Sequence, residues 1–66
     1  MQINDAITNP PTHNKIVLGY DFDGDPILVF KSGRFWYPQG TQVYDIGDAN
    51  FSVTVCNWVE IPKVSN

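Results

Sequence analysis

Disulfide bridges and long hydrophobic segments are both missing from this sequence of 66 residues. It contains one cysteine, Cys56, so no intramolecular disulfide forms, and a lone thiol is typical of a reducing compartment. No stretch approaches the roughly 20 apolar residues that a transmembrane helix needs. The first residues, MQINDAITNPP, have neither a basic start nor an apolar run. We therefore expect no signal peptide, no membrane partner and an intracellular location.

Positive charge is also scarce. Four Lys or Arg residues stand against seven Asp or Glu residues, which gives a formal net charge of −3. Proteins that bind nucleic acid directly present a basic patch or stripe, and the sequence contains no such run. We expect no direct contact with nucleic acid.

Residues suited to catalysis are few. Cys56 and His13 are the only candidates for a nucleophile and its base. His13 falls in a proline-rich segment, and Cys56 falls in an apolar segment where a small buried residue is the simpler interpretation. One cysteine and one histidine do not supply the roughly four ligands of a zinc site. The sequence predicts neither an enzyme nor a cofactor.

Aromatic residues, by contrast, are abundant, with two Trp, three Tyr and four Phe. A chain of this length buries only roughly 60% of its unfolded surface, and large rings offset that limit because each one buries a large area. Apolar residues alternate with a period of two and show no 3.6-residue period, which predicts strands rather than helices. Homo-oligomerisation is a further way to add buried surface.

The pattern predicts an all-β fold, a single antiparallel meander of four to five strands, curled or half-barrel in shape. Strands are expected at 15–22, 26–31, 34–38 and 51–61, with a short one at 43–46. Asp23-Gly24 predicts a two-residue hairpin turn, and a change of apolar phase after Asn57 predicts a bulge. The boundaries are an extended N-terminal arm at 1–14, a β domain at 15–62 and a C-terminal tail at 63–66.

Residues 20–27, YDFDGDPI, place three aspartates at alternate positions, as calcium loops do. An EF-hand loop needs glycine at its sixth position and glutamate at its twelfth, whereas a count from Asp21 places Pro26 and Ser32 there. A solvated hairpin turn is the better interpretation, because Asp favours turns through local hydrogen bonds. A metal-binding module that uses Asp21, Asp23 and Asp25 stays an alternative.

Residues 34–40, RFWYPQG, contain three consecutive aromatics. Neighbours on a strand point to opposite faces, so the three rings do not share one core. Either some of this aromatic surface is presented for contact, or the N-terminal arm or the 39–50 segment covers it. Trp, Tyr and Arg are the residues that interfaces favour at their energetic centres.

Three segments, PPTHNKIVLGYD, SGRFWYP and NWVEIP, together resemble a family of small phage and prophage proteins. Members have a proline-rich start, a Gly-x-(Trp/Phe)-(Trp/Tyr) strand and a closing Trp-x-x-(Leu/Ile)-Pro strand, although the usual tryptophan near the N-terminus is lacking here. The resemblance covers most of the chain. It implies a phage origin and a small β-rich fold, and it implies no catalytic residues.

These observations predict a phage-encoded, non-enzymatic interaction protein in the host cytoplasm. It would bind and inhibit or modulate a host protein of the transcription or anti-phage defence machinery. A structural virion component that assembles through edge strands is a second hypothesis, and the metal-binding module is a third. The expected partner-binding residues are Arg34, Trp36, Tyr37, Tyr44, Asp21, Asp23 and Asp25.

Overall fold

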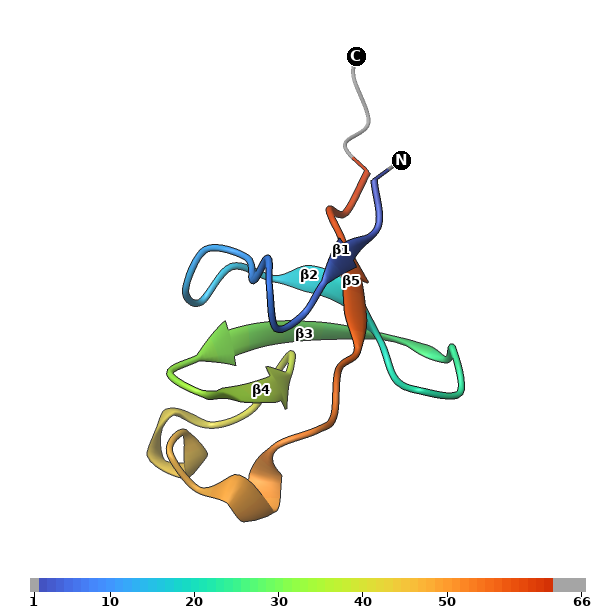
Figure 1. The fold of residues 1–66 in the computed structure, drawn as a ribbon. Coiled ribbons are helices and arrows are strands. Elements are labelled where there is room, and N and C mark those ends of the chain that lie inside the picture. Colours follow the sequence, from blue (N-terminus) through green and yellow to red (C-terminus); the bar gives the residue numbers. More distant parts are fainter. Residues whose placement is uncertain (1, 63–66) are drawn as a thin grey trace.

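The computed structural model describes residues 2–62. Their strands form one antiparallel sheet in the order β1-β5-β2-β3-β4 (Figure 1). The predicted all-β antiparallel fold is confirmed. The strands and two 3-10 turns are β1 (Asn4–Asp5), β2 (Val17–Tyr20), β3 (Pro26–Ser32), β4 (Phe35–Pro38), η1 (Val43–Asp45), η2 (Ala49–Phe51) and β5 (Asn57–Val59). Within residues 2–62 no helix is long and apolar enough to cross a membrane.

The middle of the sheet, β2 to β4, is a meander, as its sequence predicts. Val17 pairs with Val29 and Phe30 pairs with Tyr37, so β-branched and aromatic residues face each other across neighbouring strands. Gly33 and Arg34 form the two-residue turn between β3 and β4. Local sequence is sufficient for this part because each strand pairs with the next one in the chain.

The N-terminal segment does more than extend along the surface. Asn4 pairs with Trp58, and β1 thereby becomes one edge of the sheet beside β5. A turn follows, and the backbone N–H of Ala6 donates to the carbonyl of Cys56 at 3.0 Å. The two ends of the chain are therefore joined in one ladder. The predicted tail at 63–66 lies outside the described residues.

The segment at 43–46 is a 3-10 turn, so the predicted short strand is wrong. Asp45 N–H donates to the Gln42 carbonyl at 2.9 Å, and Ile46 N–H donates to the Val43 carbonyl at 3.2 Å. A strand here would need a free edge to pair with, and Val53 occupies the outer edge of β4 by donating to the Trp36 carbonyl at 2.8 Å. The β propensity of this stretch is overridden because no partner is available.

The predicted strand at 51–61 is also divided. Its start is the 3-10 turn η2, its middle bridges to β4 at Val53, and only β5 pairs with β2. The chain thus crosses from the β4 edge to the β2 edge (Figure 1). The change of apolar phase after Asn57 therefore marks this crossing and not the predicted bulge. Trp58 and Val59 are neighbours in sequence and point to opposite faces of β5, and both side chains are buried.

The core lies between the sheet and this crossing segment. Its buried members are Ala6, Val17, Val29, Trp36, Val55 and Trp58. Gly19 allows the close approach of the crossing segment, because a Cβ there would lie 2.7 Å from Val29 Cγ2 and 3.1 Å from Val55 Cγ1. Burial of each large apolar side chain contributes about 1.5–3 kcal/mol.

Candidate interaction surface

The loop between β2 and β3 is a three-residue hairpin, Phe22 to Gly24, and not the two-residue turn that Asp23-Gly24 predicts. Gly24 N–H donates to the Asp21 carbonyl at 3.0 Å, and Asp21 N–H donates to the Asp25 carbonyl at 3.3 Å. Gly24 has φ +83°, the left-handed conformation that the last residue of such a loop adopts. We call residues 21–25 the hairpin tip.

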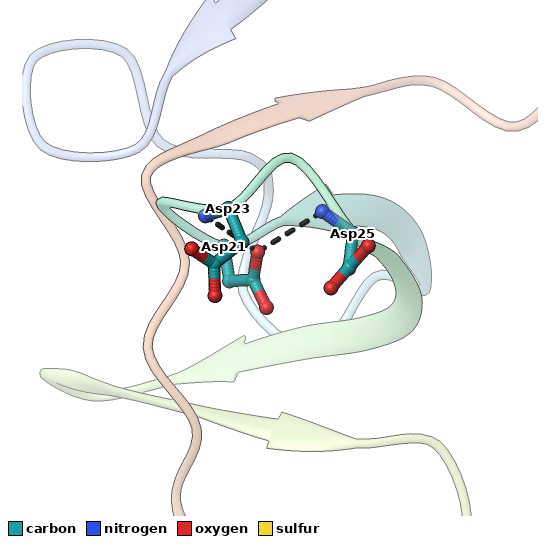
Figure 2. A group of neighbouring side chains, drawn as sticks. All are labelled: Asp21, Asp23 and Asp25. Atoms are coloured by element: carbon teal, nitrogen blue, oxygen red, sulfur yellow. Dashed lines mark hydrogen bonds between the residues drawn. The ribbon is translucent and has the colours of Figure 1, made fainter.

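The Asp21 carboxylate holds the tip together (Figure 2). Its Oδ1 atom accepts the backbone N–H of Asp23 at 2.9 Å and that of Asp25 at 3.0 Å. A carboxylate that bonds N–H groups two and four residues later is the local device that makes Asp favourable in turns. The tip is therefore built by its own residues, as the sequence predicts for an aspartate-rich turn.

The three carboxylates of the tip also lie close together. One oxygen from each of Asp21, Asp23 and Asp25 lies within 4.8 Å of the others, with Asp23 and Asp25 exposed. Oxygen atoms at this spacing suit a hard cation such as calcium, which takes six to eight oxygen ligands. Within residues 2–62 the group has no fourth carboxylate, histidine or cysteine. With one oxygen from each carboxylate, the group supplies half or fewer of the ligands of a calcium site.

Phe22 is the one large apolar side chain of the tip and is 78% exposed. The expected strand at 15–22 includes Phe22 and places it on the same face as Ile16, Leu18 and Tyr20. That prediction is wrong because β2 ends at Tyr20, and the alternation of faces does not extend into the turn. The sequence contains the necessary signal, since a glycine two residues after Phe22 suits a three-residue loop as well as a two-residue one.

Surface hollows lie on both sides of Phe22. One is lined by Ile3, Tyr20, Asp21, Phe22, Gly24, Cys56 and Asn57. The other is lined by Asp21, Phe22, Asp25, Pro26, Ile27, Val53 and Thr54. Phe22 and Asp21 belong to both. We call these two hollows, with the tip between them, the Phe22 surface; sequence reasoning missed its apolar members because Ile3 and Cys56 come from the two ends of the chain.

The other expected contact residues are dispersed. Trp36 belongs to the core, and Tyr37 is fully buried on the opposite face, so neither is available at the surface. The ring of Tyr37 lies 5.8 Å from that of Phe30, and its hydroxyl accepts the N–H of Gly47 at 2.8 Å. The sequence left open whether the rings of RFWYPQG are exposed or covered by another segment. The Tyr37 ring is covered, and the 39–50 segment covers it.

Arg34 and Tyr44 are exposed but lie outside the tip. Arg34 occupies the β3–β4 turn, at the end of β3 opposite the tip (Figure 1). The six residue steps of β3 between these ends span about 20 Å. Tyr44 is on η1 and is 83% exposed beside Val43. The structure brings together the three aspartates but not the seven predicted residues.

Cys56 and His13, which the sequence offers as a nucleophile and its base, differ in burial and in position. Cys56 is half-buried in the hollow beside Ile3 and Phe22, whereas His13 is exposed and lines neither hollow of the Phe22 surface. Backbone N–H bonds from Thr8 and Ile7 lower the pKa of Asp5, which is a turn residue of the N-terminal segment. Its role there is structural.

Comparison with known proteins adds no identification: no family model, no curated protein and no solved structure matches this chain.

Proposed function

We propose that this chain is a non-enzymatic interaction protein that acts through contact with another protein, by way of the Phe22 surface. The supporting observation is the position of Phe22, an aromatic ring 78% exposed on a turn between two hollows. Burial of a phenylalanine side chain is worth about 1.5–3 kcal/mol, and this contribution is left unused in the isolated chain. Aromatic rings next to pockets are the residues that dominate binding energy at interfaces.

Single exposed apolar residues are normal on a small protein, so the argument depends on their gathering. Ile3 and Tyr20 flank Phe22 in one hollow, and Pro26 and Ile27 flank it in the other. Tyr20, Pro26 and Ile27 belong to the same hairpin as Phe22, whereas Ile3 comes from the N-terminal segment and is brought to this hollow by the folded sheet. A gathering of exposed apolar residues is typical of a protein-binding site.

The resemblance to small phage proteins extends this proposal to a biological setting. The chain would be phage-encoded, would act in the host cytoplasm, and would bind and modulate a host protein of transcription or anti-phage defence by occlusion. Small size, net acidity and the scarcity of catalytic residue types all favour action by contact.

The test is affinity capture from a lysate of the bacterial host, with three immobilised forms compared. The wild type and Ile7→Ser should retain the same specific protein, and Phe22→Ser should lose it. Ile7 is the matched control because it is also a highly exposed apolar residue on an aspartate-capped turn. If no protein is retained specifically, or if Phe22→Ser retains it equally, the proposal fails.

Assembly into a virion through edge strands is less well supported. β1 has two residues, and the outer edge of β4 is already bridged by Val53. Short or covered edges are the usual means by which proteins avoid strand addition. Light scattering at high concentration separates the two ideas, since a contact protein of this kind stays monomeric and an edge-assembling one grows.

A further inference from the structure

Among residues 2–62, no ion pair joins the negative charge of the hairpin tip to a cation. Asp21, Asp23 and Asp25 carry three of the seven acidic groups of the chain within five residues. In residues 2–62 the single ion pair joins Lys15 Nζ to Glu60 Oε2 at 2.6 Å, away from the tip. Lys31 donates to the Gly33 carbonyl at 2.7 Å, beside Arg34 in the turn at the far end of β3. The β2–β3 hairpin thus separates its charges, with acids at one end and bases at the other.

Acidic and apolar groups alternate within the Phe22 surface itself. Asp21 lines both hollows, and Asp25 lines the one that Pro26 and Ile27 complete. A long cationic side chain suits this arrangement, because its methylene stem packs on apolar surface while its charged head reaches a carboxylate. Arginine suits it further, since the guanidinium pairs with carboxylates in a fork and stacks on aromatic faces such as that of Phe22.

The same charges exclude other classes of partner. Phosphate groups of nucleic acid or of an anionic membrane surface would be repelled by three adjacent carboxylates. A purely apolar ligand would leave those carboxylates without partners and would gain nothing from them. A basic protein surface is the partner that suits both the carboxylates and the apolar residues of the site.

We infer that the Phe22 surface binds a basic, extended segment of the partner protein, with an apolar side chain in the hollow beside Phe22 and an Arg or Lys against Asp21 and Asp25. The inference rests on the proposed function, because it names the chemistry of the partner at the same surface. Attraction between the acidic tip and the basic segment speeds association and weakens with salt.

Cys56 provides a native reporter for the test. It is the single cysteine of the chain and lines the hollow beside Ile3 and Phe22. A segment seated there should slow the alkylation of Cys56 by iodoacetamide in proportion to occupancy, so the rate measured against peptide concentration yields an affinity. The probes are three synthetic eight-residue peptides: alternating Leu-Arg, alternating Ser-Arg and alternating Leu-Glu.

The Leu-Arg peptide should protect Cys56, the Ser-Arg peptide should bind at least about tenfold more weakly, and the Leu-Glu peptide should give no protection. Phe22→Ser should lower the affinity for Leu-Arg at least about tenfold. Replacement of the three tip aspartates by Asn should also lower the affinity for Leu-Arg at least about tenfold and should abolish the salt dependence of binding. The Asn side-chain oxygens still accept the hydrogen bonds of the turn. Ile7→Ser and Asp48→Asn are the controls and should leave the affinity unchanged.

Three results would overturn the inference: equal protection by Leu-Glu, unchanged affinity in the aspartate variant, or losses in the controls as large as those in the tip variants. Micromolar binding of calcium or magnesium alone to the three aspartates, measured by calorimetry, would overturn it as well by assigning the cluster to a metal. If the peptides fail but host capture depends on Phe22, the proposed function stands without this partner chemistry. If the peptides succeed and no host protein is captured, the proposed function fails.

Discussion

Two turns of this protein are each closed by an aspartate carboxylate that accepts backbone N–H groups, but the two turns have different roles. In the N-terminal turn at residues 5–9, Asp5 Oδ1 accepts two backbone N–H groups at 2.8 and 3.0 Å. In the hairpin tip, Asp21 Oδ1 accepts two at 2.9 and 3.0 Å. Each turn also carries one highly exposed apolar side chain, Ile7 in the first and Phe22 in the second.

Their tertiary neighbours are what differ. The N-terminal turn begins with Ala6, which is buried in the core, and ends at Asn9, whose carbonyl accepts the indole N–H of Trp58 at 2.8 Å. Asn9 Nδ2 also donates to Asn4 Oδ1 at 2.9 Å. Among residues 2–62, the hydrogen bonds of the hairpin tip join only its own residues. An aspartate-capped turn is therefore structural where a remote side chain donates a hydrogen bond to it, and is available for contact where, among residues 2–62, none does.

The largest effect on stability is expected from removal of the Trp58 side chain, which donates a hydrogen bond to the N-terminal turn. Trp58→Ala should destabilise the protein by about 3–5 kcal/mol, because a buried ring leaves a cavity and the Asn9 carbonyl loses its donor. A core of this size supplies only about 3–5 kcal/mol net, so the variant should be largely unfolded in water by circular dichroism. The milder Trp58→Phe keeps most of the bulk and should cost about 1 kcal/mol in urea titration. A wild-type midpoint for Trp58→Ala would show that the turn does not depend on this anchor.

The hairpin tip should respond to its own backbone instead. Gly24→Ala should cost about 1–2 kcal/mol in urea titration, because the left-handed conformation at φ +83° is strained for a residue with a Cβ. Apart from the adjacent residues of the turn, no atom of residues 2–62 lies within 4 Å of the added methyl group, so the cost comes from the local backbone conformation rather than from a tertiary clash. Gly24→Asn is the matched control and should cost less, since Asn tolerates this region. Equal stability of Gly24→Ala and wild type would contradict the assigned turn.

A smaller, pH-dependent effect should distinguish the carboxylate of the N-terminal turn. The pKa of Asp5 is lowered from 3.8 in the folded chain, so its ionised form stabilises the fold above that value. This stabilisation disappears as the pH falls through the folded-state pKa. Asp5→Asn, which keeps an acceptor oxygen, should be less stable than wild type at about pH 6, and the difference should close in strong acid. A gap that is constant with pH in urea titrations would refute this assignment.

The smallest effect on stability should come from Phe22. Phe22→Ser should change the free energy of unfolding by no more than about 0.5 kcal/mol, because the ring is mostly exposed. The same holds for its counterpart Ile7→Ser. A large loss of stability in Phe22→Ser would mean that the ring supports the fold, and the contrast between the two turns would disappear.

Local sequence predicted the meander, because β2, β3 and β4 pair with their neighbours along the chain, although the β2–β3 loop has three residues and not the two predicted. It failed at 43–46 and 51–61, where β-forming residues do not pair as one continuous strand. The outer edge of β4 is taken by Val53, which arrives after a long excursion. It also left open which aromatic ring of β4 is exposed, and the structure buries both Trp36 and Tyr37.

The sequence by itself determined that this chain forms antiparallel strands around aromatic residues and that its aspartates gather on a tight turn. Alternation and turn chemistry act between residues a few positions apart, so they can be read along the chain. Only the tertiary structure decided that Ile3 and Cys56 line one hollow with Phe22, and that the Trp58 indole donates to the Asn9 carbonyl. Both arrangements bring together residues 19 or more positions apart, and the pairing of β1 with β5 in one sheet creates them.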